Sequence, residues 1–155
     1  MQAIMAMAKN RAIGLNGDLP WGRIYKDDFK WFKEFTINKS ILVGGGTYKK
    51  LPPLKNRTIW VLSNTIKEGA GGMSGGGEWT MYHYTSNVNI VPDNVIVAGG
   101  KTIYELLMPK ITEFYVTEID KEYEGDTFMS PFEHLFPKQL VVKEFDFGKV
   151  ICYTK

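Results

Sequence analysis

The residues with the clearest chemical potential stand in a stretch whose spacing predicts an amphipathic helix. Asp28, Trp31, Phe32 and Phe35 recur at intervals of three and four, so one face of this helix carries a carboxylate and three aromatic rings. Burying an unpaired carboxylate costs free energy and raises its pKa. Asp28 therefore either caps the start of the helix or binds a cationic or hydrogen-donating ligand. The neighbouring Asp27 can cap or face water while Asp28 points inward.

A short segment just before this helix combines a rigid turn with a large apolar ring. Leu19, Pro20 and Trp21 are followed by the flexible Gly22. A segment of this kind can open and close over a neighbouring site. The sequence therefore predicts a lid beside the carboxylate of Asp28.

Two glycine-rich junctions follow predicted buried strands, at residues 43–47 and 98–102. Glycine lets a phosphate approach the backbone, and the N–H groups at a helix start stabilise its charge. Neither junction has the spacing of a dinucleotide fingerprint or a P-loop, and either one alone is more typical of tight packing between strand and helix. As a pair at the carboxyl ends of two strands, they predict a crevice for a ligand with two linked phosphates.

The remaining chemistry-bearing residues narrow the reaction class. The sequence contains no nucleophile beside a base, and His83 and His134 stand alone without partners at metal-ligand spacing. We expect structural or surface roles for both histidines and no metal site. One inward acid beside a phosphate crevice favours hydride transfer from a carried cofactor over hydrolysis.

The composition fits one globular domain spanning residues 1–155, with 44% hydrophobic and 14% aromatic residues. The net charge of +2 is spread without a basic run, which disfavours nucleic acid or a membrane as partner and favours a small molecule. Cys152 is the only cysteine, and the N-terminus has no basic-then-apolar leader. We therefore expect a cytoplasmic protein without disulfides.

Apolar runs and turn residues predict a layered α/β fold. The glycine-rich stretch 68–78 is expected to be a loop, and Thr102 with Glu105 to form a capping box at a helix start. Residues 140–147 and 150–153 are expected to pair as a hairpin. Buried strands are expected at 3–8 and 41–43, and further strands at 58–62, 80–82, 94–98 and 114–119, alternating with helices.

A series of further motifs runs in order along nearly the whole chain. They are Ile13-Gly14, Leu19-Pro20-Trp21, Asp28 with Trp31-Phe32, Gly44 with Thr47, Leu54 with Arg57, Leu62-Ser63, Gly99-Gly100 with Ile103-Tyr104, Phe114-Tyr115-Val116-Thr117 and Glu124-Gly125-Asp126-Thr127. In these motifs the chain resembles the dihydrofolate reductase family.

That resemblance implies a three-layer α/β fold with a central mixed, mostly parallel, eight-stranded sheet flanked by helices. It also implies an oxidoreductase that acts on a CH–NH group in one-carbon metabolism. The implied reaction is NADPH-dependent hydride transfer to 7,8-dihydrofolate, giving 5,6,7,8-tetrahydrofolate.

By this resemblance, Asp28 accepts hydrogen bonds from the 2-amino group and a ring nitrogen of the pteridine, and Thr117 supports it through its hydroxyl. Leu19 and Trp21 complete the implied catalytic set. Arg57 binds the α-carboxylate of the glutamyl tail with its planar fork. The implied substrate contacts are Met5, Ala6, Asp28, Phe29, Phe32, Leu51, Leu54, Arg57, Ala98 and Tyr104.

The resemblance also implies a path for NADPH, with one phosphate at Thr47, another near 99–102, and the adenosine beside Ser63 and Asn64. The implied cofactor contacts are Ala6, Ile13, Gly14, Leu19, Gly44, Gly45, Gly46, Thr47, Leu62, Ser63, Asn64, Ala98, Gly99, Gly100, Lys101, Thr102, Ile103 and Tyr104.

The chain departs from the family pattern at several positions. Gly45 stands where the family usually has an arginine for the adenosine 2′-phosphate, and Asn64 replaces a common Ser or Arg. Loss of such a charged contact costs on the order of 1.5–3 kcal/mol of affinity, so NADH is an alternative cofactor. Lys49, Lys67 and Lys101 are candidates to compensate.

Two other departures concern the substrate side. An extra residue lies between Trp21 and Asp28, so Asp28 is assigned by its distance to Trp31, with Asp27 as the second choice. Ala98 stands where a larger aliphatic residue is usual, which predicts a roomier pocket and altered antifolate binding.

Three functional hypotheses follow. The first is an active reductase, expected as a monomer that binds dihydrofolate and antifolates. The second is a binding or structural protein that keeps the fold without turnover. The third is a related reductase of pterin or pyrimidine precursors.

Overall fold

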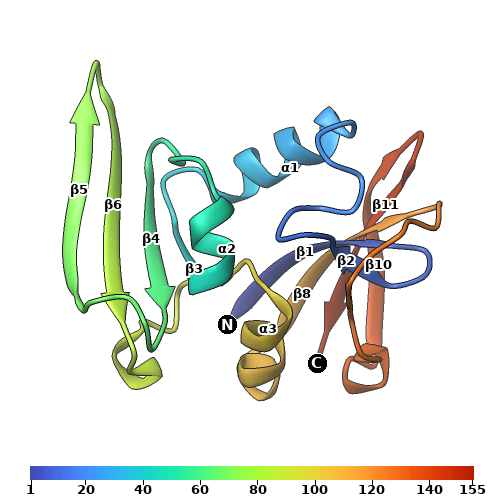
Figure 1. Cartoon of the computed structure of the whole chain (residues 1–155). Helices are drawn as coiled ribbons and strands as arrows, with labels where there is room; N and C mark the ends of the chain where they lie inside the picture. The colour runs from blue at the N-terminus through green and yellow to red at the C-terminus, as the bar shows by residue number, and fades with distance from the viewer.

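One nine-stranded sheet runs through the computed structural model, which describes residues 1–155 (Figure 1). Five of its eight strand pairings are parallel and lie in the middle of the sheet, and the antiparallel pairings lie towards its two sides. The strands in spatial order are β10 (Lys138–Phe145), β11 (Gly148–Thr154), β8 (Glu113–Ile119), β1 (Gln2–Ala8), β7 (Ile96–Val97), β3 (Ser40–Gly44), β4 (Arg57–Leu62), β6 (Glu78–Thr85) and β5 (Gly69–Gly75).

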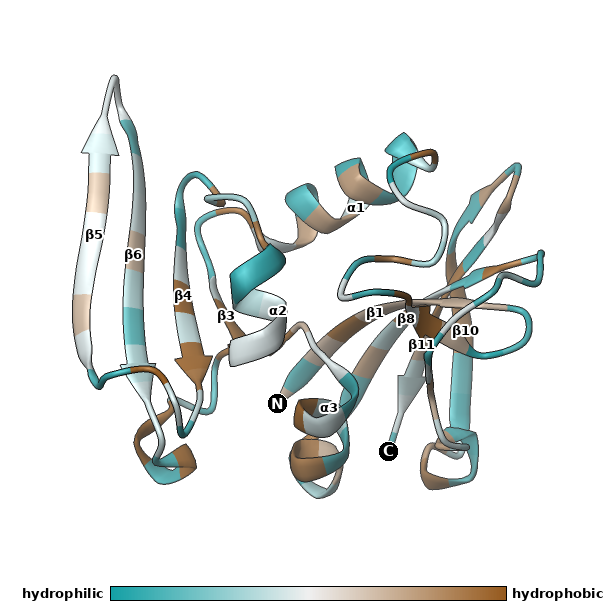
Figure 2. Cartoon of the chain, viewed as in Figure 1, coloured by the Kyte–Doolittle hydropathy of each residue, from teal (hydrophilic) through white to brown (hydrophobic).

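The central strands are buried on both faces, as their unbroken apolar runs predict. In β3, Ile41 and Val43 pack in one hydrophobic cluster, whereas Leu42 between them packs in another. Because neighbouring strand residues point to opposite faces, the sheet separates two cores. Figure 2 shows brown, hydrophobic colour at the end of β4 and along α3.

Helices cover both faces and give the three expected layers. Helix α1 (Lys26–Thr36) and helix α2 (Gly45–Lys50) contribute aromatic side chains to the core on one face. Helix α3 (Lys101–Leu107) packs its buried residues into the core on the other face. None of the helices has the length and apolarity needed to span a bilayer.

Smaller elements join these layers. A two-stranded sheet pairs β2 (Ala12–Gly14) with β9 (Thr127–Phe128). Single 3₁₀ turns occupy Val88–Ile90, Met108–Lys110 and Glu133–Leu135. The C-terminal hairpin of β10 and β11 is present as predicted.

The glycine-rich stretch 68–78 was wrongly expected to be a loop. It forms strand β5, which pairs antiparallel with β6 from Gly69 opposite Tyr84 to Gly75 opposite Glu78. The backbone groups of β6 offer hydrogen-bond partners that outweigh the poor strand propensity of glycine. Gly76 and Gly77, with φ of +58° and +79°, make the tight turn between the strands. This strand raises the count to nine from the eight that the resemblance implied.

The expected capping box at α3 is also absent. The cap position lies two residues earlier than the predicted Thr102, at Gly100, which provides no side chain. Thr102 is therefore inside the first turn. Glu105 lies 3.8 Å from the ammonium of Lys101 and accepts a hydrogen bond from the Ser130 hydroxyl at 3.3 Å.

Candidate active site

The acid of helix α1 points into the protein. Tyr25 occupies the cap position without a side-chain hydrogen bond, so neither Asp27 nor Asp28 caps the helix. Asp28 is only 8% exposed, whereas Asp27 faces solvent. Asp28 lies in the first turn but does not cap the helix through a hydrogen bond, which leaves ligand binding as the open alternative.

A threonine on β8 holds the carboxylate of Asp28. The Thr117 hydroxyl donates a hydrogen bond of 2.6 Å to Oδ1, and Thr117 pairs across the sheet with Ala6 of β1. Burial raises the pKa of Asp28, and the hydrogen bond from Thr117 opposes that shift in part. No other hydrogen bond from the chain reaches this carboxylate, so Oδ2 is free to accept from a ligand.

The expected lid packs tightly over aromatic side chains. Trp21 is buried, and its ring centroid lies 6.3 Å from that of Tyr25 and 5.7 Å from that of Tyr123. The tyrosine hydroxyls are hydrogen-bonded to each other. The indole N–H of Trp21 is buried without an acceptor, although buried donors are normally paired. Leu19 is half-buried against the same cluster.

Arg57 is a buried cation without a carboxylate partner. It opens strand β4, is 4% exposed, and its Nε–H lacks an acceptor. Burial lowers the pKa of its guanidinium. The loop before it is fixed by a 2.9 Å hydrogen bond from the Thr80 hydroxyl to the Leu54 carbonyl. Leu51, Leu54 and Phe32 belong to one apolar cluster, so the structure brings these expected substrate residues together.

The two glycine junctions meet, as the sequence predicts. The Gly44 N–H donates to the Gly99 carbonyl at 2.9 Å. A Cβ added at Gly100 would lie 3.4 Å from the Thr47 hydroxyl, and one at Gly44 would lie 3.0 Å from Ile103. Side chains at these positions would narrow the space between the two helix starts, where the sequence predicts the phosphate crevice.

Packing against Ser63 also explains why residue 45 is a glycine. A Cβ at this position would lie 2.9 Å from the Ser63 hydroxyl oxygen, closer than van der Waals contact allows. The arginine that the family usually carries would therefore require Ser63 to move. Of the lysines considered as substitutes, Lys101 lies near Glu105, whereas Lys49 and Lys67 are exposed.

The other expected residues surround these groups. Tyr104 is fully buried and its hydroxyl donates to the Ile4 carbonyl at 2.6 Å, so it ties α3 to β1. Phe29 is half-buried, with the Arg23 guanidinium 5.1 Å from its ring centroid. Of the remaining positions, Met5 and Ala6 lie on β1, Ile13 and Gly14 on β2, Leu62 ends β4, Ser63 and Asn64 follow it, Ala98 follows β7, and Gly46, Thr102 and Ile103 lie on α2 and α3.

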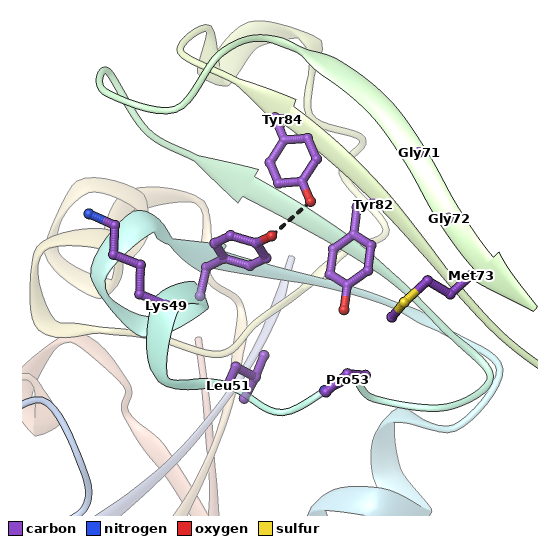
Figure 3. Close-up of a pocket in the computed structure, with 9 residues that line it drawn as sticks. Lys49, Leu51, Pro53, Gly71, Gly72, Met73, Tyr82 and Tyr84 are labelled. Atoms are coloured by element: carbon purple, nitrogen blue, oxygen red, sulfur yellow. Dashed lines mark hydrogen bonds between the residues drawn. The ribbon is translucent and has the colours of Figure 1, made fainter.

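The sequence did not predict the cavity that lies beside the β5–β6 hairpin. It has a volume of about 510 Å³. The Tyr48 and Tyr84 hydroxyls share a 2.9 Å hydrogen bond beside it, and Figure 3 shows Tyr82 next to Met73. The alternation of Tyr82 and Tyr84 in β6 indicates a face lined by tyrosines. The cavity could not be predicted because β5, which faces β6, was expected to be a loop. The lining residues of this tyrosine cleft are Tyr48, Lys49, Leu51, Pro53, Gly71, Gly72, Met73, Tyr82 and Tyr84.

Comparisons with known proteins agree with the fold. A family model described as dihydrofolate reductase matches residues 1–143. The dihydrofolate reductase of Buchnera aphidicola subsp. Baizongia pistaciae is 26% identical over 161 residues, which cover 98% of this chain and 87% of that protein. That of Staphylococcus aureus is 26% identical over 133 residues, covering 85% and 79%.

A solved structure gives the same result. Dihydrofolate reductase from Enterococcus faecalis, complexed with NADP(H) and RAB-propyl, superimposes with a TM-score of 0.73 at 27% identity. The match covers 99% of this chain and 94% of that one. The chain therefore belongs to the dihydrofolate reductase family.

Proposed function

We propose that Asp28 binds the pteridine ring in the reaction of the chain's family, the NADPH-dependent reduction of dihydrofolate. The observation that carries this assignment is the buried carboxylate, with Oδ1 held by Thr117 and Oδ2 free. An amino group and an adjacent ring N–H form a pair of donors that matches the two oxygens of a carboxylate. The ligand would thus supply the partner that a buried acid requires.

Two properties of Asp28 suit it to assist proton delivery. Its raised pKa keeps a proton accessible closer to neutral pH than in an ordinary aspartate. Its burial strengthens the hydrogen bonds that its carboxylate makes. Thr117 acts as a positioning residue, because its hydroxyl fixes one carboxylate oxygen.

Arg57 is proposed to bind the carboxylate of the glutamyl tail. Its guanidinium is buried with an unpaired N–H, a state that an anionic ligand would relieve. A planar fork binds a carboxylate through two parallel hydrogen bonds. The apolar cluster containing Leu51 and Leu54 would cover the aromatic part of the same ligand.

The glycine crevice fits the linked phosphates of NADPH, because any side chain at Gly44 or Gly100 would narrow it. Gly44 to Thr47 and Gly99 to Thr102 would hold the cofactor, with Ser63 and Asn64 beside its adenosine. When bound, NADPH supplies the hydride. Gly45 lacks the arginine side chain with which the family binds the 2′-phosphate of NADPH. The preference of this chain for NADPH over NADH is therefore a separate point to measure.

Because every residue proposed for this site belongs to one chain, we expect a monomer to be sufficient for activity. Dihydrofolate is the proposed substrate, and antifolates are proposed to bind the same place. The cytoplasmic location stays a prediction.

A steady-state assay of NADPH oxidation with dihydrofolate tests the proposal directly. We expect turnover with NADPH, weaker turnover with NADH, and loss of both in Asp28→Asn. Absence of turnover in the folded wild type would favour the hypothesis of a binding protein. A pterin that lacks the glutamyl tail should be a poorer substrate, and equal turnover of the two would favour a pterin reductase instead.

A further inference from the structure

The two outer strands of the large sheet differ in how they protect their free edges. An unpaired strand edge offers a row of N–H and C=O groups to any other strand, and proteins normally block it with charges, proline or a bulge. Strand β10 carries Lys138, Lys143 and Glu144, and its pairing with β11 is irregular between Val141 and Lys143. That edge is blocked.

Strand β5 has none of these features. Its sequence, Gly-Ala-Gly-Gly-Met-Ser-Gly, has no charged residue and no proline, and all seven residues are exposed. Its pairing with β6 runs without a register shift. The hairpin projects at one side of the molecule, where β5 is the last strand (Figure 1). This edge is open along its whole length.

We propose that β5 pairs antiparallel with β5 of a second copy, so that one sheet continues through a two-fold symmetric dimer. A two-fold axis perpendicular to the sheet joins identical patches and keeps each face continuous. The register that pairs all seven residues places Gly72 opposite Gly72 of the second copy. It then pairs Ala70 with Ser74 and Gly71 with Met73 across the interface.

The side chains on the cleft face fit this register. Met73 is 53% exposed, and in the dimer it would lie opposite Gly71 of the second copy, where an added Cβ has nothing within 4 Å. Gly71 in turn pairs with Tyr82 on β6, whose ring lies in the tyrosine cleft (Figure 3). Each methionine would thus cover a glycine and meet a tyrosine ring of the other copy, a favourable sulfur–aromatic contact.

The opposite face gains apolar contacts as well. Met81 and Trp79 are 43% and 38% exposed, and they pair with Gly72 and Ser74 of β5. Next to the two-fold axis, the Met81 side chains of the two copies would be separated only by Gly72 of each copy. The face that is unpartnered in one chain becomes continuous in the dimer.

The length of β5 sets the strength of this association. Seven residues span roughly 23 Å of edge at about 3.3 Å per residue. Such a strip buries less than the roughly 1,600 Å² of a standard stable interface. We therefore expect a reversible dimer whose population rises with protein concentration.

Sedimentation equilibrium over a wide range of protein concentrations tests the proposal. The average mass of the wild type should rise from 17.6 kDa towards twice that value. A mass that stays at one chain at every concentration would overturn the proposal, as would growth beyond two chains. The first of these outcomes would leave the edge free for a different, extended partner.

Charge variants test the register. In Ala70→Lys with Ser74→Lys, like charges would face each other twice across the interface, so the dimer should be lost. In Ala70→Lys with Ser74→Glu, opposite charges would face each other and the dimer should return. Persistence of the dimer in the first variant, or failure of the second to restore it, would overturn the assignment.

Matched controls separate this effect from general changes of charge. Leu140→Lys with Val142→Lys places two lysines on the exposed outer strand β10, and this variant should dimerise like the wild type. Turnover of dihydrofolate by all variants should stay unchanged, because Ala70 and Ser74 lie outside the proposed active site. This readout shows that each variant is folded, and the dimer stands or falls independently of the proposed function.

Discussion

Glycine has opposite roles at the centre of the sheet and in its outer hairpin. At the centre, Thr117 donates a hydrogen bond to one oxygen of the buried Asp28, and Gly44 and Gly99 are joined by a backbone hydrogen bond. In the hairpin of β5 and β6, glycines lie exposed at the margin of the sheet. The same residue type therefore brings backbones together in the crevice and leaves a strand edge open in the hairpin.

The difference separates two kinds of sensitivity to mutation. Changes at the centre should act on turnover, because groups there have fixed partners at short distances. Changes in the hairpin should act on local stability or on association and spare turnover. The following experiments test this division.

The largest effect is expected from Asp28→Asn, which keeps the size of the side chain and removes its charge. Loss of a general acid or base typically reduces the rate by about 10²–10⁴-fold, and we expect kcat/KM for dihydrofolate to fall in that range. Steady-state kinetics with saturating NADPH measures it. Asp27→Asn is the matched control and should leave kcat/KM unchanged, because Asp27 faces solvent.

Arg57→Ala should chiefly weaken substrate binding. Loss of a buried charge pair costs about 3 kcal/mol, which corresponds to roughly a hundredfold rise in KM for dihydrofolate. A pterin without the glutamyl carboxylates is the control substrate, and its KM should hardly change in the variant. An equal loss for both substrates would show that Arg57 acts on the fold and does not bind the tail.

Thr117→Val removes the hydroxyl that holds Asp28 and keeps the shape of the side chain. Loss of a hydrogen bond to a charged group costs about 1.5 kcal/mol, so we expect roughly a tenfold fall in kcat/KM. The same loss should raise the pKa of Asp28 further and shift the pH profile of kcat/KM upward. Thr117→Ser should restore both, whereas an unshifted profile would show a purely structural role.

Two glycines in the hairpin provide a matched pair for stability. A Cβ at Gly72 would lie 2.9 Å from the Thr80 carbonyl oxygen, whereas one at Gly71 meets nothing within 4 Å. Gly72→Ala should therefore lower the free energy of unfolding by about 1–3 kcal/mol, and Gly71→Ala should be tolerated. Urea denaturation compares them, and turnover of the folded variants should not differ. A loss of turnover in either variant would contradict the division between centre and hairpin.

The smallest effect concerns the dependence of stability on pH. Burial raises the pKa of Asp28, so the folded protein holds a proton in a pH interval where the unfolded chain has released it. The free energy of unfolding should therefore fall as the pH rises from the ordinary aspartate range through the raised pKa. Urea denaturation at several pH values should show a flatter dependence for Asp28→Asn than for Asp27→Asn.

Much of the central architecture could be predicted because local patterns agree with it. Apolar runs such as that of β3 identify buried strands, and the spacing in α1 predicts that Asp28 faces inward. The contact between Asp28 and Thr117 joins positions 89 residues apart, and only the family resemblance suggested it. Local spacing carries no information about such long-range pairs.

The errors have a common physical cause. Strand β5 is poor in strand-forming residues, and it is a strand because β6 presents a free edge to it. At α3, the cap lies two residues before the predicted Thr102, directly after Gly99, whose carbonyl accepts a hydrogen bond from Gly44 of β3. In both places tertiary partners decided a structure that local propensity predicts wrongly.

The hydrogen bond between Gly44 and Gly99 has a consequence for how this chain can evolve. Because main-chain atoms set the width of the crevice at that point, selection cannot widen it by exchanging the amino acids that form the bond. A change in the ligand that the crevice accepts must instead come from the residues that border it, such as Ala98. We expect such variation to arise through changes in side-chain volume on a fixed backbone frame.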